Sequence, residues 1–226
     1  GATVNVNVLN RDVLAGFLNS GISSQIDTTG DAVITAIADE SLLGITIAGA
    51  ATAGNTAISG NIPVYVSSST VNAQAGDRTA INASGSIDVM ASLRSQDYII
   101  AANISASNST AVGATLSTAV FMNTVQALVG AGSRLNAAGE SIVNANRANK
   151  RRGLTVSAYA REDIIMVSVG ASLSGSTAVT GVVNTLVVNN TVKAEAASNA
   201  ALTAGEDEGT GSGDSGISLD MEAEDE

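Results

Sequence analysis

The sequence predicts an all-β protein, a parallel β-helix (β-solenoid) built from sequence units of about 54 residues. Apolar and polar residues alternate with a period of two in short runs such as residues 3–8 and 87–91, which is typical of half-buried strands. Short signatures also recur along the chain in a fixed order. The chain is 45% hydrophobic but only 2% aromatic, so small and β-branched side chains must fill its interior, as they do in stacked coils.

Four signatures define the repeat and follow one another in the same order. The first begins with Thr-Ala, the second has Val followed two residues later by Ala, the third is a short run ending in Gly, and the fourth is an alternating strand. The first signature occupies residues 56–60, 110–113 and 177–181, and the second occupies residues 10–15, 69–73, 123–127 and 190–194. The third occupies residues 26–30, 81–85, 135–139 and 202–205, and the fourth occupies residues 32–36, 87–91, 154–158 and 217–221. Clusters of Gly, Asn, Ser and Thr between the runs supply turn residues.

The spacing of the second signature gives the length of the unit. Its valines, Val13, Val71, Val125 and Val192, are separated by 58, 54 and 67 residues. The longest interval contains an insertion at residues 140–152, and removing these thirteen residues restores an interval of 54. We therefore expect one solenoid segment of a longer chain, with units at about residues 1–59, 60–112, 113–180 and 181–226.

The length of the unit also bears on how the chain winds. A unit of about 54 residues is too long for one coil of a narrow β-helix, so we expect two or three coils per unit. Coils about 4.8 Å apart place each side chain over its equivalent in the next coil. Asn10, Asn123 and Asn190 are expected at one corner of successive units, where stacked amides can hydrogen-bond along the axis. For any single one of them, an ordinary turn residue is the simpler interpretation.

Missing residue types exclude several classes of protein. The chain has no Cys and no His, which excludes disulfide frameworks, zinc fingers, thiol nucleophiles and a Ser-His-Asp triad. A net charge of −11 and the scarcity of aromatic residues disfavour nucleic-acid binding. Residues 41–76, 98–133 and 164–192 carry no charge, but Ser, Thr, Asn and Gly interrupt them, so we expect no transmembrane helix and no membrane insertion.

The acidity of the chain is local. Residues 1–205 hold all ten basic side chains and twelve acidic ones, whereas residues 206–226 hold the other nine acidic side chains. Residues 206–215 form a second insertion, at the same place in its unit as residues 140–152. The earlier insertion is basic and the later one acidic, so the two loops are expected to project side by side and to attract each other weakly. Two separate, solvated loops are an equally good interpretation.

Both insertions contain candidate binding residues. Clustered carboxylates and glycines make the acidic loop a weak Ca²⁺ candidate, although its spacing matches neither an EF-hand nor a calcium-binding β-roll. The basic loop is a possible anionic-ligand patch, although such charge clusters are usually only solvated. The acidic candidates are Glu206, Asp207, Glu208 and Asp214, and the basic ones are Arg147, Lys150, Arg151 and Arg152.

Adjacent acidic pairs raise the alternative of a polysaccharide-degrading β-helix. Asp39 and Glu40 form one such pair, Glu162 and Asp163 another, and the middle unit has Arg94 and Asp97 in the comparable region. Because the feature recurs with the repeat, charged turns facing solvent are the simpler interpretation. A further alternative is an ice-binding solenoid, which requires a flat array of threonines that recurs on every coil. The candidate threonines are too widely spaced for such an array unless several lie on one face: Thr35, Thr56, Thr110, Thr155 and Thr177.

The repeat resembles those of very large secreted bacterial adhesins. Asn-Thr-Val-x-Ala at residues 123–127, Asn-Ala-x-Gly at residues 136–139 and the alternating strand at residues 154–158 carry this resemblance. It is greatest to leukotoxin-type filamentous adhesins of anaerobic bacteria and looser to the filamentous haemagglutinin class, and it extends over residues 1–204. The two insertions are absent from the plain repeat of these families.

The resemblance implies that the parallel β-helix is right-handed and that it is a structural stalk or binding surface of a secreted bacterial cell-surface adhesin. Such a protein attaches to host cells or other surfaces through a protein or glycan receptor that the sequence does not identify. We expect no enzyme activity and no cofactor, and the resemblance supplies no catalytic residues. The alternatives are a β-helical polysaccharide-degrading enzyme and a tailspike-like carbohydrate-binding solenoid.

Overall fold

The computed structural model describes residues 1–17, 23–139, 152–205 and 217–225. The described residues form long and short β-strands joined by turns, with no helix among them. The strands are β1 (Ala2–Phe17), β2 (Ser24–Thr28), β3 (Ala32–Ala51), β4 (Thr56–Ala75), β5 (Thr79–Ala83), β6 (Ile87–Ser107), β7 (Thr110–Val129), β8 (Arg134–Ala137), β9 (Arg152–Ser174), β10 (Thr177–Ala196), β11 (Ala201–Ala204) and β12 (Ile217–Asp225).

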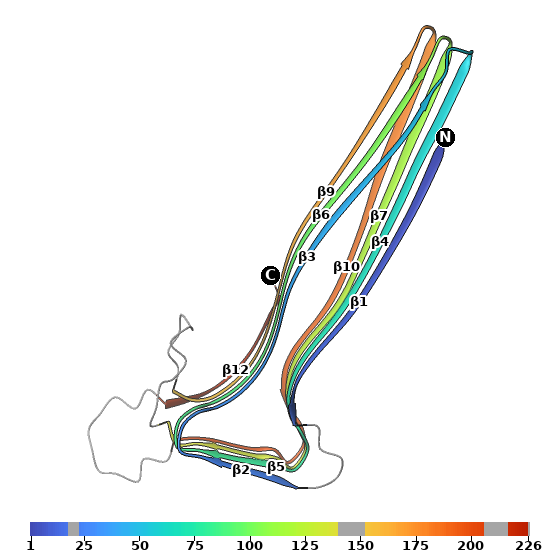
Figure 1. Cartoon of the computed structure of the whole chain (residues 1–226). Coiled ribbons are helices and arrows are strands. Elements are labelled where there is room, and N and C mark those ends of the chain that lie inside the picture. Colours follow the sequence, from blue (N-terminus) through green and yellow to red (C-terminus); the bar gives the residue numbers. More distant parts are fainter. Residues whose placement is uncertain (18–22, 140–151, 206–216, 226) are drawn as a thin grey trace.

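These strands form three parallel sheets. Sheet A has the order β1-β4-β7-β10, sheet B the order β11-β8-β5-β2, and sheet C the order β12-β9-β6-β3. Each strand pairs in parallel with the strand three places along the chain, so β1, β2 and β3 make one coil and β4, β5 and β6 make the next. Figure 1 shows the coils following one another around a common path. The parallel β-helix predicted from the sequence is therefore confirmed.

Each sequence unit winds a single coil, so the expectation of two or three coils per unit is wrong. Val13 pairs with Val71, Val71 with Val125 and Val125 with Val192, which are the spacings read from the sequence. The unit fits into one coil because its strands are long: β4, β6 and β9 have 20, 21 and 23 residues, whereas a typical strand has about five or six.

The coil has two parts, a triangular base and a flat arm (Figure 1). In the base, sheet B closes the space between the adjoining ends of sheets A and C. Beyond the base, the two long sheets continue face to face with no third sheet between them. We call this two-layered part the arm, and it comprises residues 2–9, 42–67, 97–121 and 164–188.

Stacked apolar columns fill the base. Along the axis, Val71 lies next to Val125 in sheet A, Ile81 next to Leu135 in sheet B, and Val89 next to Val156 in sheet C. All six side chains are fully buried, together with alanines at equivalent positions of successive coils. Columns of branched aliphatic residues and alanine therefore make up the core, as the composition predicts.

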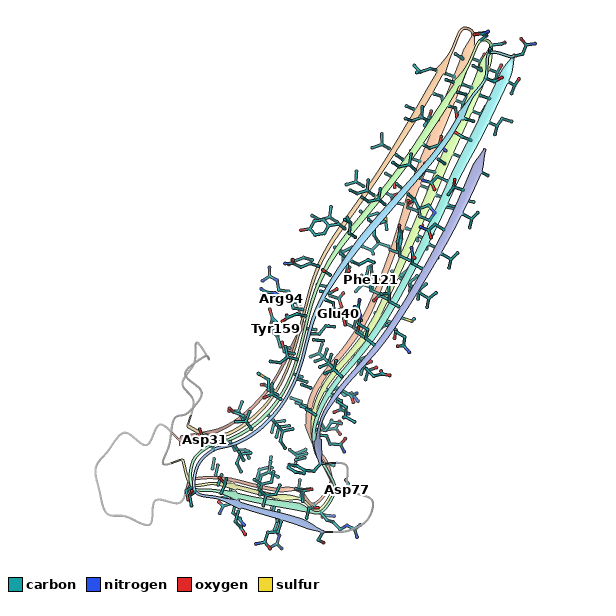
Figure 2. All side chains as sticks on the ribbon, in the orientation of Figure 1. Asp31, Glu40, Asp77, Arg94, Phe121 and Tyr159 are labelled. Atoms are coloured by element: carbon teal, nitrogen blue, oxygen red, sulfur yellow. The ribbon has the colours of Figure 1, made fainter. Side chains whose placement is uncertain are left out.

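Two corner carboxylates connect neighbouring coils. The Asp31 carboxylate accepts a hydrogen bond from the backbone N–H of Ser86 at 2.8 Å, and the Asp77 carboxylate accepts one from the N–H of Ala131 at 2.8 Å. Both acceptors lie one coil away from their donors, and Figure 2 places them at the ends of the base. Turn amides that point along the axis thus gain a partner from the neighbouring coil.

The predicted asparagine column at a corner is wrong in two respects. Asn10 pairs with Ser68 and is exposed on the outer face of sheet A, one position out of register with Asn123 and Asn190. A shift of one residue places a side chain on the opposite face of a strand. The inward column is formed by Arg11, Ser69, Asn123 and Asn190. It lies within the long strands of sheet A, not at a corner.

The arm is thin because small residues on one sheet face large residues on the other. Tyr65, Ile99, Ala119 and Phe121 form a second buried apolar cluster, close to the base. A Cβ added to Gly44 would lie 2.4 Å from the ring of Tyr65. The missing side chain of Gly44 therefore provides the space that the buried Tyr65 ring occupies.

We predict that Gly44→Ala destabilises the protein by about 1–3 kcal/mol, because the ring of Tyr65 cannot move away without disturbing its neighbours. Gly60→Ala is the matched control, since a Cβ there would meet no atom within 4 Å. Thermal unfolding followed by circular dichroism measures both variants. Equal melting temperatures for the two variants would contradict the packing of Tyr65 against Gly44.

Candidate functional site

A polar cluster lies inside the protein where the base meets the arm. Sheet C contributes Glu40, Ser95 and Glu162, which are paired neighbours in successive coils, and Asp97. Sheet A contributes Arg11, Ser69 and Asn123 from the inward column described above. We call these seven residues the junction cluster. Figure 2 shows Glu40 pointing into the space between the two sheets, whereas Arg94 and Tyr159 point outward from sheet C.

Glu40 is held by two residues of sheet A. Its Oε2 lies 2.5 Å from a guanidinium nitrogen of Arg11, and the Ser69 hydroxyl lies 2.8 and 2.9 Å from Oε1 and Oε2. The side chain of Glu40 is only 5% exposed, and that of Arg11 is 35% exposed. The guanidinium and the hydroxyl thus compensate a carboxylate that has lost most of its water.

The same arrangement continues two coils further along the stack. The Asn123 amide donates a hydrogen bond to Glu162 Oε1, and Asn123 Oδ1 accepts one from the backbone N–H of Ser69 at 3.2 Å. Glu40, Ser69, Asn123 and Glu162 therefore form one chain of hydrogen bonds through three successive coils. Each contact between a carboxylate and sheet A joins the two long sheets across the interior.

Asp97 is the least compensated acid of the cluster. It is buried, and its Oδ2 accepts a hydrogen bond from the Ser95 hydroxyl at 2.7 Å. Burial raises the pKa of Asp97 above its ordinary value, the hydrogen bond from Ser95 lowers it, the negative charge of Glu40 raises it, and Arg11 lowers it. The desolvation of the carboxylate is the largest of these effects.

The two acidic pairs are split between the faces of sheet C. Asp39 and Asp163 point outward and are exposed, whereas Glu40 and Glu162 point inward. Neighbouring residues of a strand face opposite sides, so neither pair can act as acid and base on one substrate. The interpretation of these pairs as turn charges facing solvent is wrong about the turns, because all four residues lie within β3 and β9, and is right about solvent only for Asp39 and Asp163.

Alternation in the sequence contains the signal for the buried acids. Ile34, Ala36, Ala38 and Glu40 are two residues apart, and the first three are buried in the core. Continuing this alternation places Glu40 on the inner face. Sequence alone does not identify Glu40 as buried, because acidic residues are rarely buried without a partner, and the partners Arg11 and Ser69 lie in other strands.

Other sequence-derived candidates lie largely outside the described residues. Outside these residues lie the Ca²⁺ candidates Glu206, Asp207, Glu208 and Asp214 and the basic candidates Arg147, Lys150 and Arg151. The backbone of Arg152 begins β9, where it pairs with Ile217 at the start of β12. Before the two insertions, Ala137 pairs with Ala204. Both insertions thus start and end at equivalent places of neighbouring coils.

Of the five candidate threonines, three form a column. Thr56, Thr110 and Thr177 are paired neighbours at the tip of the arm, one in each of three coils. Thr35 pairs with Met90, and Thr155 pairs with Asp88. The structure therefore brings together one file of threonines near the tip and leaves the other two apart from it.

The described part of the chain contains no group of three or more acidic side chains placed to hold a metal ion. It also contains no helix with the length and hydropathy of a membrane span. Comparison of the chain with protein-family models, with curated proteins and with solved structures finds no match.

The raised pKa of Asp97 predicts a pH-dependent stability. A carboxyl whose pKa is higher in the folded state favours folding at low pH, and this contribution is lost as the pH rises through the folded pKa. Asp97→Asn removes the buried charge, and an amide oxygen can still accept the hydrogen bond from Ser95. We expect the variant to melt a few degrees above the parent at neutral pH, with the difference vanishing below about pH 3.

Asp39→Asn is the control for this measurement, because Asp39 is exposed on the outer face of the same sheet. It should leave the melting temperature close to that of the parent at every pH. A lower melting temperature of Asp97→Asn at neutral pH would show instead that Arg11 makes the Asp97 charge favourable.

Proposed function

We propose that the chain is a structural stalk or binding surface of a secreted bacterial cell-surface adhesin, mediating attachment to host cells or other surfaces. The observation that carries this proposal is the parallel pairing of 16 to 20 residues between neighbouring strands of sheet A, interrupted between β4 and β7 only at Ile62 and Pro63. Such long pairings make each coil a stiff layer of a stack, and stacked layers offer extended outer faces to a partner. The resemblance of the repeat signatures to secreted adhesins is the second support.

The buried acids support a structural role of the interior. Arg11 and Ser69 satisfy Glu40, and Asn123 donates to Glu162, so these carboxylates hold sheet A against sheet C. A catalytic carboxylate must be within hydrogen-bond reach of its substrate, but Glu40 is only 5% exposed. The alternative of a polysaccharide-degrading enzyme therefore has less support than attachment.

Glu40→Gln distinguishes these functions. If Glu40 joins the two sheets, the substitution leaves the partly buried Arg11 uncompensated, and we expect a loss of about 1–3 kcal/mol in the free energy of unfolding. Asp163→Asn is the matched control, because Asp163 is exposed and its ion pair with Arg161, at 3.4 Å, lies on the surface. Cleavage of a polysaccharide by the parent that Glu40→Gln abolishes without a change in stability would favour the enzyme.

Attachment itself is tested with the chain coupled to fluorescent beads. We expect beads that carry the folded chain to bind cultured epithelial cells or immobilised glycans several-fold better than beads that carry the denatured chain. Pretreating the cells with protease or glycosidase then distinguishes a protein receptor from a glycan. Equal binding of folded and denatured chain to every surface would contradict a binding surface in this segment.

A further inference from the structure

The outer face of sheet C in the arm presents an apolar surface. Its outward residues in β3, β6 and β9 include no charged side chain, and the hydroxyl of Tyr98 is their only polar side-chain group. The ten large side chains among them are 39–67% exposed. We call this surface the C face: Leu43, Ile45, Ile47, Gly49, Ala51, Tyr98, Ile100, Ala102, Ile104, Ala106, Ile165, Val167, Val169, Ala171 and Leu173.

Strand register makes the C face continuous. Leu43, Tyr98 and Ile165 are paired neighbours across the three coils, as are the residues of the four following rows. Nine residues along each strand and three strands across give a surface about 28 Å long and 14 Å wide, so its projected area is about 400 Å². Soluble monomers rarely expose larger contiguous apolar patches than this.

Towards the tip, the interior of the arm is polar where the C face is apolar. The Ser59 hydroxyl donates to Asn103 Oδ1 at 2.5 Å, and the Asn61 amide donates to the backbone carbonyls of Thr46 and Ala102 at 3.1 and 3.0 Å. Ser117 and Ser168 are hydrogen-bonded at 3.0 Å. In this part of the arm the large aliphatic side chains therefore lie on the outside, where water is an unfavourable neighbour.

We propose that the C face is the interface with a second copy of this chain, packed face to face about a two-fold axis. Two sheets can pack at about 10 Å with their side chains interdigitated. Such a contact removes on the order of 1,000 Å² of accessible surface from water, which is the lower limit of specific interfaces. An isologous contact also suits a surface that carries no charge of its own, since identical copies meet without repulsion.

Charges at the edge of the C face are balanced. The border of the C face that lies next to the base carries four charged side chains on the outer side of the same strands: Asp39, Arg94, Arg161 and Asp163. Two acids and two bases give this border no net charge, and Arg161 is already paired with Asp163. A second copy with the same border can therefore approach without net electrostatic opposition, and Asp and Arg of the two copies can pair across the axis.

Sedimentation equilibrium of the complete chain and of two single-lysine variants tests the interface. Ile100→Lys places a charge on the middle strand of the C face, and Leu116→Lys places one on the outer face of sheet A, the other surface of the arm that exposes large aliphatic side chains. These two side chains are similarly exposed, at 39% and 43%. We expect the parent and Leu116→Lys to dimerise at or below about 100 µM, and Ile100→Lys to raise the dimer dissociation constant at least tenfold. Circular dichroism verifies that both variants fold.

Three results would overturn the proposal. They are a monomeric parent at that concentration, a dimer that Ile100→Lys leaves intact, and a monomeric parent that binds phosphatidylcholine vesicles through Ile100. The last result would identify lipid as the partner.

A second measurement keeps the test decisive if Ile100→Lys fails to fold. The chain contains no cysteine, so Val167→Cys introduces a single site for a spin label on the C face, in β9 beside Ile100. Face-to-face dimers should give label-to-label distances of about 2–3 nm, consistent with sheets about 10 Å apart. The same label at Leu116→Cys should give much longer distances, and the reverse order of the two distances would place the contact on sheet A.

Discussion

The parallel backbone pairing between successive coils is the constraint on which the rest of this structure depends. Because β1, β4, β7 and β10 pair without a shift over most of their length, each paired residue lies about 4.8 Å from its equivalent in the next coil. A side chain therefore has to suit a neighbour at the same position as well as its own surroundings. Columns such as Val71 beside Val125 satisfy this condition simply, since branched aliphatic side chains pack well against one another.

Charged residues are harder to stack, and the junction cluster shows how the chain avoids repulsion. Glu40 and Glu162 occupy the same column, but Ser95 separates them, so the two carboxylates belong to coils about 10 Å apart. Sheet A faces them with Arg11, Ser69 and Asn123, which provide a positive charge, a hydroxyl and an amide. Asp97 lies between these coils without a cation of its own, which explains why burial dominates its pKa.

Sequence alone could predict the parallel β-helix and its register, because Val13, Val71, Val125 and Val192 share one pattern and the structure pairs them. It could not predict the length of the coil. A strand of 20 residues and several short strands alternate in the same way, and Ser, Thr, Asn and Gly within the arm resemble turn residues. Many of them, such as Ser59, Asn61 and Asn103, line the inside of the arm instead. The buried role of Glu40 depends on Arg11 and Ser69, which only the fold brings together.

The polar interior and the apolar exterior of the arm have one physical origin. The base has three sheets and encloses space for Ile, Leu and Val, but the arm has two sheets and, as Gly44 against Tyr65 shows, little room between them. Towards the tip, Ser59, Asn61 and Asn103 fill this narrow space and form hydrogen bonds across it. Alternation then requires the outward positions to supply the β-branched residues that long strands favour. The narrow interior of the arm therefore leaves large aliphatic side chains on an apolar outer face, which a neighbour of the same shape can cover.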